Sequence, residues 1–436
     1  MSDLRERTIA IDKARVWHPY TEMSRYREEV EPLVVVRAKG SRLYDADGRR
    51  YIDGNASWWT STLGHNHPRL VAALVKQAEQ LCHTSLAGIA HPAASDLAEA
   101  ICAVAPSGLE HVFYSDNGST AVEVGMKLAL QYWAQNGHPE RCAFIALDNA
   151  FHGETLGVTA LGGVDVFRAP FQKVLLECLR VPTPAGEGNL DRSLESLRQV
   201  FTQHGDRIAA VVVESMIQGA AGMQIYDPEF LRQARSLCTE HDVFLICDEV
   251  FSGYGRTGPM WACEHADVVP DILCTAKGFS GGMLPMAATL TTDRIFQGFL
   301  GAPERAFYYG HTFCGNPLGA SVAIEVLRVF EDESILAASV PKAERIARTF
   351  RDMELLAGVT RSRSIGMVGA IDLEGGEGYL ADIGWRVYER ARERGAYLRP
   401  LGNVVYITPS LNISDEDLDE LLEIVRESVS EILALS

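Results

Sequence analysis

The middle of the chain constrains the fold most strongly. Residues 208–214 and 243–248 are short, nearly continuous apolar runs, and each ends in a carboxylate. Residues 228–241, which lie between them, have the apolar spacing of a helix. Apolar strands that alternate with helices are typical of a mostly parallel sheet, because the crossover helices cover both faces of such a sheet. The sequence therefore predicts an α/β fold.

The two ends of the chain are predicted to form a second, smaller unit. Residues 33–36 and 42–48 have the pattern of a strand and a hairpin, and the chain from about Ile324 is richer in charged helices. A length of 436 residues also favours more than one domain. The predicted division is a smaller α+β domain from residues 1–57 and 326–436, and a large domain from residues 58–325.

Two local patterns in the C-terminal part make predictions of their own. Ser414, with Asp417 three residues later, is a helix-start signal, and apolar residues after it are spaced along one helix face. This pattern predicts a final helix that begins just after Ser414. Arg361-Ser362-Arg363 has the composition of a solvated turn, and we interpret it as one.

Charge and cysteine content limit the partners and the compartment. A net charge of −18 argues against nucleic acid and anionic membrane surfaces as partners. No stretch reaches the roughly 18 apolar residues that a membrane span needs, and the charged start of the chain does not resemble a secretory signal. The nine cysteines form no Cys-x-x-Cys pair. We therefore expect a cytoplasmic protein without a nucleic-acid or membrane partner.

Asp248 and Lys277 are the strongest candidates for chemistry. Asp248 ends a predicted buried strand, and ligands of open α/β sheets bind outside such strand ends. Lys277 follows another predicted strand and precedes the glycine-rich Ser280-Gly281-Gly282. A pyridoxal 5'-phosphate (PLP) site needs such a pair, because the lysine amine condenses with the cofactor aldehyde and the carboxylate keeps the ring nitrogen protonated. An acidic strand end beside an unrelated lysine is the alternative explanation.

Two further segments could complete a PLP site. Residues 115–120 lead directly into a helical run, and backbone N–H groups at a helix start bind phosphate. Phe151 follows the predicted strand 143–147, where its ring could stack on the cofactor. Taken alone, these features are more typical of a helix cap and of a core phenylalanine. His65 and His67 have no acidic or cysteine partner at ligand spacing, so we predict a loop and no metal site.

Taken together and in order, the motifs resemble the class III aminotransferases over about Trp17 to Pro409, nearly the whole chain. The matching motifs are Asn117-Gly118-Ser119, Phe151-His152-Gly153, Glu214 with Gln218-Gly219, Asp248-Glu249-Val250, Gly255-Arg256-Thr257-Gly258, Lys277-Gly278, Gly310-His311-Thr312-Phe313 and Gly315-Asn316-Pro317.

The resemblance implies a PLP-dependent transferase of fold type I that works as a homodimer. Lys277 would be the catalytic lysine, and Thr312 would reach the cofactor phosphate of the neighbouring subunit. The cofactor-binding residues that it implies are Gly118, Ser119, Phe151, Asp248, Lys277, His311 and Thr312.

Narrower motifs resemble the biotin-pathway branch of that family. They are Trp17-His18-Pro19-Tyr20-Thr21, Ser57-Trp58-Trp59, Ala262-Cys263-Glu264-His265 and Leu398-Arg399-Pro400-Leu401-Gly402. This branch aminates 8-amino-7-oxononanoate to 7,8-diaminononanoate, usually with S-adenosylmethionine as amino donor and in a minority of members with lysine.

This narrower resemblance implies which side chains bind the substrate. They are Tyr20, Trp58, Phe151, Gly310 and Arg399. An alkyl chain suits an aromatic slot, and a terminal carboxylate suits the forked donor of Arg399. A tryptophan pair in the core and a solvated loop arginine are the alternative explanations for Trp58-Trp59 and Arg399.

Three residues depart from the pattern of the family or of this branch. Phe151 stands where tyrosine is usual in the branch, which preserves stacking but removes a hydroxyl. Ser215 and His311 each stand where a proline is frequent, and we interpret Ser215 as local backbone tolerance. Three other functions stay open. One is a class III aminotransferase for ω-amino acids or ornithine, another is a PLP-dependent mutase or decarboxylase, and the third is a scaffold that has lost its chemistry. The presence of both Asp248 and Lys277 counts against the last.

Overall fold

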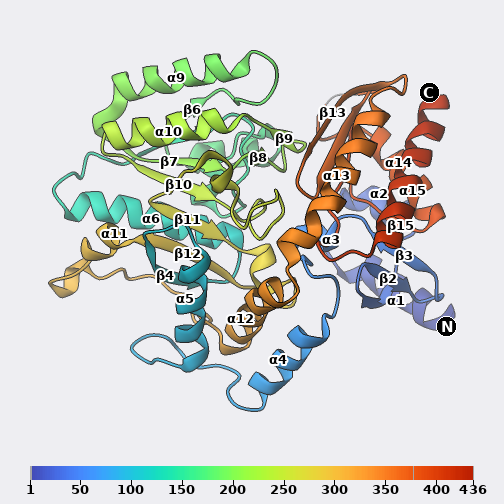
Figure 1. Ribbon diagram of the computed structural model, residues 1–436, viewed down its shortest axis with the longest axis horizontal. Coiled ribbons are helices and arrows are strands. Elements are labelled where there is room, and N and C mark those ends of the chain that lie inside the picture. The colour runs from blue at the N-terminus through green and yellow to red at the C-terminus, as the bar shows by residue number, and fades with distance from the viewer. Residues whose placement is uncertain (1, 377, 436) are drawn as a thin grey trace.

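The computed structural model describes residues 2–376 and 378–435. It has two parts (Figure 1). One part contains a large sheet between layers of helices, and the other contains two small sheets with helices from both ends of the chain.

The large sheet is mostly parallel, as predicted. It has seven strands, and all of them run in one direction except β12, which is antiparallel to both of its neighbours. The predicted strand 208–214 is confirmed without change, and the predicted strand 243–248 begins one residue later. In spatial order the strands are β4 (Leu109–Ser115), β12 (Ala287–Thr292), β11 (Ile272–Thr275), β10 (Phe244–Asp248), β7 (Ile208–Glu214), β5 (Ala143–Leu147) and β6 (Cys178–Val181).

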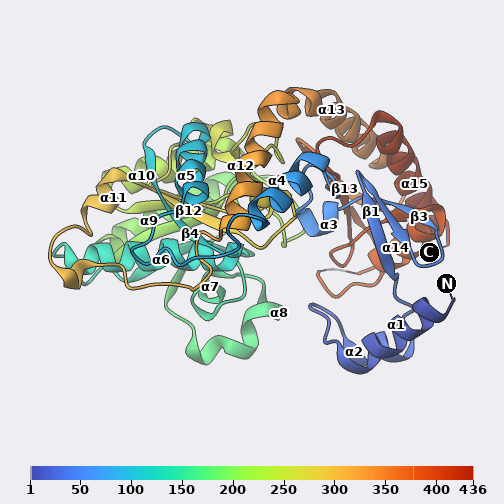
Figure 2. The same ribbon diagram turned by 90° about the horizontal axis from the view of Figure 1, so that it is seen from below.

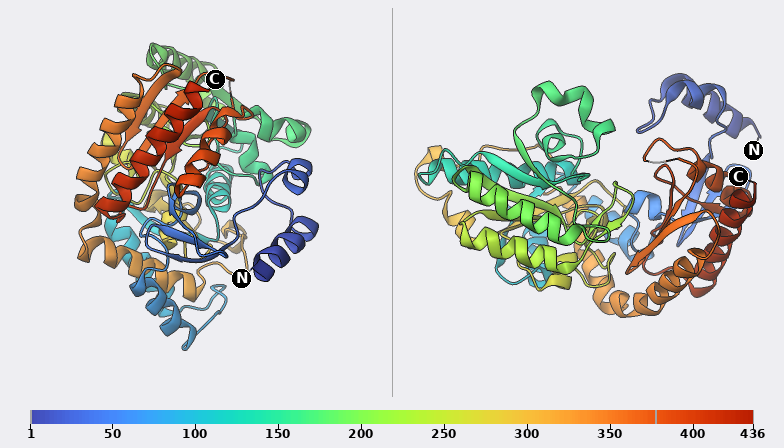
Figure 3. Two further views of the ribbon diagram at one scale, coloured as in Figure 1. Left: turned by 90° about the vertical axis from the view of Figure 1, so that its right-hand side faces the viewer. Right: turned by 90° about the horizontal axis from the view of Figure 1, so that it is seen from above.

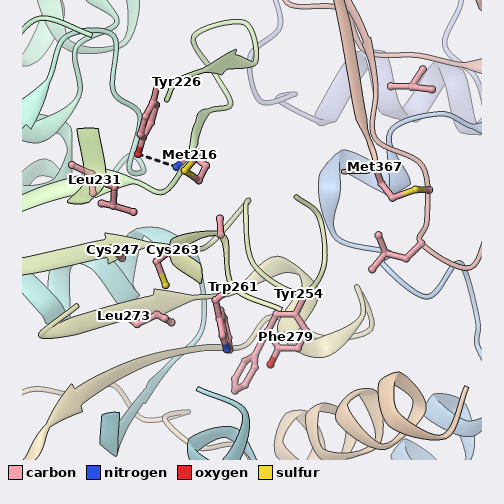
Figure 4. Close-up of a cluster of buried hydrophobic side chains, with 14 of the residues drawn as sticks. Met216, Tyr226, Leu231, Cys247, Tyr254, Trp261, Cys263, Leu273, Phe279 and Met367 are labelled. Carbon is pink, nitrogen blue, oxygen red and sulfur yellow. Dashed lines mark hydrogen bonds between the residues drawn. The ribbon is translucent and has the colours of Figure 1, made fainter. Parts of the chain in front are cut away.

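The central strands β7 and β10 are apolar up to the carboxylates that end them, because both faces of the sheet are covered. In β10, Phe244 and Ile246 pack in the cluster that contains α6 (Gly118–Gln135). Leu245 and Cys247 point to the opposite face, into the cluster that contains α10 (Pro228–Glu240). Figure 4 shows part of this second cluster, with Cys247 and Leu273 beside Trp261 and Cys263. Alternation along each strand therefore fills two separate cores.

The other helices of this part belong to the same layers or to loops between them. They are α4 (Pro68–Ala78), α5 (Pro92–Val104), α7 (Leu156–Leu161), α8 (Asp165–Arg168), α9 (Asn189–His204), α11 (Asp293–Gln297) and α12 (Pro317–Asp332). Short 3-10 helices are η1 (Ala169–Val174), η2 (Gly205–Arg207), η3 (Ala262–Ala266), η4 (Lys277–Ser280) and η5 (Pro303–Arg305), and β8 (Ile217–Gln218) pairs with β9 (Gln224–Ile225).

The two ends of the chain meet in the second part. Strands β1 (Val35–Lys39), β2 (Arg42–Asp45) and β3 (Arg50–Asp53) form a sheet whose last strand is β15 (Ala396–Tyr397), parallel to β3. Blue N-terminal and red C-terminal elements accordingly lie side by side in Figures 1 and 3. The remaining elements are β13 (Val359–Ile365), β14 (Val368–Leu373), β16 (Val404–Ile407), α1 (Ser2–Arg15), α2 (Met23–Glu28), α13 (Ile335–Met353), α14 (Ile383–Arg394) and α15 (Asp415–Ala434).

We propose the division at residues 57/58 and 325/326 as the domain limits. Helix α12 runs through the second limit and connects the two parts. Figure 2 shows that α1–α2 and the segment with α7 and α8 project from the same side of the molecule.

One of the two local predictions is confirmed and the other is wrong. Helix α15 begins after Ser414, whose Oγ accepts a hydrogen bond from Asp417 N at 3.1 Å. Arg363, however, lies in strand β13 and is buried, because its guanidinium donates to Asp372 Oδ1 at 2.6 Å and to carbonyls of the β8–β9 turn. Within the described residues, no helix is long and apolar enough to cross a membrane.

Candidate active site

A cavity of about 620 Å³ lies at the carboxyl ends of the parallel strands. Its wall is built from the start of α6, the loops after β5, β10 and β11, and residues 57–60. This is where open α/β sheets bind ligands. Seven residues predicted from the sequence line it, namely Tyr20, Trp58, Gly118, Ser119, Phe151, Asp248 and Lys277.

Lys277 lines this cavity and lies two residues after the end of strand β11. Its backbone is left-handed, with φ of 40°, and its Nζ lies 4.5 Å from the centre of the Trp59 ring. Burial lowers the pKa of this amine to about 8, although the carboxylates of Asp248, Glu214 and Glu154 act to raise it. A lysine with a lowered pKa has a useful neutral fraction near pH 7 and is a competent nucleophile and base.

Asp248 is held in place at the end of strand β10 by two donors. With the proton on Nδ1, His152 donates to Asp248 Oδ2 at 2.7 Å, and Val250 N donates to Oδ1 at 3.0 Å. Both side chains are buried. His152 thus fixes the orientation of the carboxylate that would face a cofactor ring nitrogen. The sequence motif contained His152 but gave it no role.

Glu214, at the end of strand β7, ties two loops to the sheet. Its carboxylate accepts hydrogen bonds from Phe151 N and Gly219 N, both at 3.0 Å. Burial raises the pKa of Glu214 to about 7, with His152 acting to lower it and Asp248 to raise it. Glu214 therefore fixes the backbone of Phe151, whose side chain lines the cavity.

The start of α6 offers backbone donors for a phosphate. Asn117 caps the helix by accepting from Thr120 N at 2.9 Å, while the N–H groups of Gly118 and Ser119 belong to the unpaired first turn. A Cβ at Gly118 would lie 2.5 Å from Val250 Cγ1, so glycine allows the helix to approach the β10 loop. The Ser119 hydroxyl, in contrast, accepts from the N–H groups of Glu154 and Thr155. Because the Thr155 hydroxyl donates to Glu123, the Ser119 hydroxyl donates its own hydrogen to Thr155 Oγ1 at 2.9 Å. The backbone N–H of Ser119 is therefore the group left for phosphate.

These groups fit PLP. An amine with a lowered pKa, a positioned carboxylate and a helix start converge on one cavity, with an aromatic ring above it. Each is the type of group that the cofactor's aldehyde, ring nitrogen, phosphate or ring face requires. Within the described part of the chain, no three His, Cys, Asp or Glu side chains form a metal site, and His65 instead pairs with Asp53 at 2.8 Å.

The two tryptophans reach the cavity through a left-handed turn, Ala56–Trp59. Its φ angles are 45°, 48°, 63° and 75°, a conformation that costs about 1–2 kcal/mol per residue for non-glycine side chains. Asp53 stabilises the turn because its Oδ2 accepts from Ser57 N at 2.7 Å. The turn points Trp58 into the cavity and places Trp59 under Lys277, where Trp59 is buried against Phe251.

Two aromatic residues that the sequence did not single out complete the wall, Phe167 of α8 and Tyr379. The Phe167 ring centre lies 5.3 Å from that of Tyr20, 5.6 Å from that of Phe151 and 5.0 Å from that of Tyr379. Through its contact with Tyr20, Phe167 packs the projecting α8 segment against the loop between α1 and α2. We refer to Tyr20, Trp58, Phe151, Phe167 and Tyr379 as the aromatic wall.

Arg399 lies behind the aromatic wall and is not a lining residue of the cavity. Its guanidinium carbon is 4.0 Å from the centre of the Trp58 ring, and its backbone N–H donates to Asn55 Oδ1 at 2.7 Å. The guanidinium thus covers one face of Trp58. A ligand carboxylate that extended beyond the Trp58 ring could bind this guanidinium.

Three predicted residues stand apart from the cavity of their own chain. Gly310, His311 and Thr312 lie in a loop before α12, and Gly310 and Thr312 are exposed. His311 Nε2 is 3.2 Å from Oδ1 of Asp116, which is a lining residue. These three residues were predicted only from the family resemblance, which implies that Thr312 contacts the cofactor phosphate of the neighbouring subunit.

Comparisons with known proteins agree with this geometry. The sequence model described as "Aminotransferase class-III" matches residues 23–429. The adenosylmethionine-8-amino-7-oxononanoate aminotransferase of Geobacter sulfurreducens is 39% identical over 96% of each chain.

Solved structures are similar over nearly the whole chain. The enzyme of the same name from Methanocaldococcus jannaschii has a TM-score of 0.94 at 34% identity, covering 98% of this chain and 99% of that one. An amine transaminase from an uncultivated Pseudomonas species, solved in its PLP-bound form, has a TM-score of 0.91 at 29% identity, covering 96% and 98%.

Proposed function

Because the chain belongs to the class III aminotransferases and is a PLP-dependent transaminase of fold type I, we propose that it aminates 8-amino-7-oxononanoate to 7,8-diaminononanoate in biotin synthesis. The observation that carries this proposal is the placement of Lys277 inside an aromatic cavity with Arg399 behind Trp58. Such a cavity suits a long alkyl chain that has its reacting ketone at one end and a carboxylate at the other.

PLP, when bound, supplies an aldehyde that accepts the amino group and a ring that withdraws electrons. Lys277 Nζ is the group that would hold the cofactor through its aldehyde, with loss of water, and an incoming amino donor would free the amine again. The freed amine, with its pKa lowered to about 8, takes the proton from the α-carbon of the donor. In the second half-reaction Lys277 delivers a proton to the ketone carbon that becomes the amine carbon.

The other side chains hold this arrangement. Asp248 keeps a ring nitrogen protonated, and His152 keeps Asp248 oriented. The first N–H groups of α6 bind the phosphate. Phe151 would stack on the cofactor ring, and Glu214 holds the backbone N–H of Phe151 in place. Tyr20 and Trp58 exclude water from the alkyl chain.

We extend the proposal to a homodimer in the cytoplasm. The loop with Gly310, His311 and Thr312 is available for the phosphate site of a second copy, and Tyr308 and Phe313 beside it are 79% and 58% exposed. Exposed aromatic side chains of this size are common at subunit interfaces. The partners proposed for the active site are small molecules, the amino ketone and the amino donor.

The alternatives differ in the acceptors that they would use. An ω-amino acid or ornithine transaminase would prefer the keto partners of those amines, and a mutase or decarboxylase would not need two separate substrates. We expect 8-amino-7-oxononanoate to be the best acceptor in a panel with such keto compounds, measured as kcat/KM. A protein that shows no cofactor absorbance and no bleaching with any amine would be a scaffold without chemistry.

Arg399→Ala is expected to raise KM for 8-amino-7-oxononanoate about 10- to 100-fold, because a charge-assisted contact to the carboxylate is lost in a partly dry site. The methyl ester of the same substrate serves as the control. Wild type and variant should differ far less on the ester than on the acid. An equal response of acid and ester would show that Arg399 does not bind the carboxylate.

We expect S-adenosylmethionine, and not lysine, to bleach the visible absorbance of the holoenzyme. Its sulfonium gains about 0.5–2 kcal/mol against an aromatic face, and Trp58 is an aromatic side chain that lines the cavity. Mixing with each donor separately decides the question, and bleaching by lysine alone would reverse the assignment. Phe151→Tyr is the companion variant, since faster bleaching in it would show that the missing hydroxyl matters.

A further inference from the structure

Glu154 places a carboxylate in the active-site cavity that the reaction described above does not use. The residue follows Phe151-His152-Gly153, and its backbone N–H donates to Ser119 Oγ at 3.1 Å. A Cβ at Gly153, where φ is 133°, would lie 2.4 Å from Ser119 Cβ. Glycine therefore lets this loop press against the start of α6 and project Glu154 into the cavity, which it lines.

The carboxylate of Glu154 has one oxygen engaged. The hydroxyl of Tyr20 donates to its Oε1. Burial and the contact with Glu154 raise the pKa of Tyr20 well above its usual range, so this hydroxyl stays a donor at physiological pH. Within the described chain Oε2 has no hydrogen-bond partner, and it is free to accept one from a ligand.

Other carboxylates of the cavity are already engaged within the protein. Glu214 accepts from two backbone N–H groups, and Asp248 accepts from His152 and Val250 N. Asp116 accepts from the side chains of Asn117 and Thr120. All three contacts of Asp116 are at Oδ1, the third being His311 Nε2 at 3.2 Å, so Asp116 Oδ2 is open as Glu154 Oε2 is. Of these two carboxylates, Glu154 is the one bonded to the aromatic wall, through Tyr20. Among the lining residues of the described chain Lys277 is the one Lys or Arg. The cavity thus has room for a second cationic nitrogen.

Glu154 lines the same cavity as Lys277, and its charge acts to raise the pKa of the Lys277 amine. The aromatic neighbours Phe151 and Phe167 carry no polar atom on their side chains. An ammonium group beside Lys277 would face these apolar rings on that side, and a nearby carboxylate favours its charged form. Glu154, with its free oxygen, supplies the missing acceptor.

We propose that Glu154, supported by Tyr20, binds the ammonium on the carbon next to the ketone and so selects acceptors that carry an amino group beside the reacting carbonyl. The proposal rests on the function proposed above. In 8-amino-7-oxononanoate the amine is one carbon from the carbonyl, so a group that binds it must face the cavity that holds Lys277, as Glu154 does. Arg399 would bind the opposite end of the same molecule. Simple ketones would gain nothing from Glu154.

The test compares two acceptors in Glu154→Gln, which removes the charge and keeps an oxygen for Tyr20. Holoenzyme is first loaded with amino groups by the donor, and single-turnover kcat/KM is then measured with 8-amino-7-oxononanoate and with 7-oxononanoate. We expect the variant to lose about 10- to 100-fold on the amino ketone, the effect of one charge-assisted contact, and to change less than about threefold on 7-oxononanoate, which lacks that contact.

Glu195→Gln, an exposed carboxylate on α9 that bonds Gln199, is the matched control and should leave both acceptors unchanged. Glu154→Asp keeps the charge and should retain the preference for the amino ketone, even if both rates fall. An equal loss on both acceptors in Glu154→Gln would show that Glu154 only supports the loop, and would overturn the inference. Failure of the wild type to use either acceptor would instead overturn the proposed function.

Discussion

Lys277→Ala is expected to lower turnover on the order of 10⁴-fold or more, since both the covalent attachment and the proton transfer depend on this amine. The structure explains why no other group would replace it. Lys277 is the one lysine among the lining residues of the described chain, and Nζ lies over Trp59 within the field of three carboxylates. Single-turnover absorbance with the donor measures the loss.

The variant should remain folded, because the Lys277 amine makes no hydrogen bond within the described chain and an alanine leaves the packing of Trp59 on Phe251 in place. Circular dichroism and the melting temperature serve as the control for folding. Transamination at a rate near that of the wild type would show that Lys277 has been assigned wrongly.

Asp248→Asn is expected to slow the first half-reaction on the order of 100- to 1,000-fold, similar to the loss of one preorganised electrostatic contact in other active sites. A neutral amide no longer favours a protonated ring nitrogen, so the electron-withdrawing ring is weakened. The amide oxygen can replace Oδ1 as the acceptor for Val250 N, and the amide NH2 can donate to His152 Nδ1 when the imidazole proton is on Nε2. The fold should therefore survive while cofactor retention weakens.

Rapid mixing with the donor measures the proton-transfer rate, and equilibrium dialysis measures how tightly the variant retains PLP. Asp206→Asn, on the exposed turn before β7, is a control that should change neither. An unchanged first half-reaction in Asp248→Asn would contradict the role given to this carboxylate.

The core of the fold and the centre of the site are predictable from the sequence for a local reason. Strands β7 and β10 are continuous apolar segments, so their ends, and Asp248 with them, can be located from composition alone. The start of α6 has the local signal of a capped helix. These features do not depend on which distant segment packs against them.

The aromatic wall could not be predicted in this way because distant segments build it. Phe167, Tyr379 and Tyr20 come from three segments far apart in the sequence and meet only after the chain has folded. The left-handed turn that carries Trp58 runs against the intrinsic preference of its residues and is held by Asp53. The prediction of a solvated turn at Arg363 is wrong for the same reason, since its partners on β14 and the β8–β9 turn are remote in sequence.

The most direct test of the central claim is a single turnover with the proposed acceptor. Holoenzyme is bleached with its amino donor, freed of that donor by gel filtration and mixed with one equivalent of 8-amino-7-oxononanoate. The account predicts that the visible absorbance of the cofactor returns and that one equivalent of 7,8-diaminononanoate is found by mass spectrometry. Return of the absorbance with the keto partner of an ω-amino acid or of ornithine, but not with 8-amino-7-oxononanoate, would contradict it.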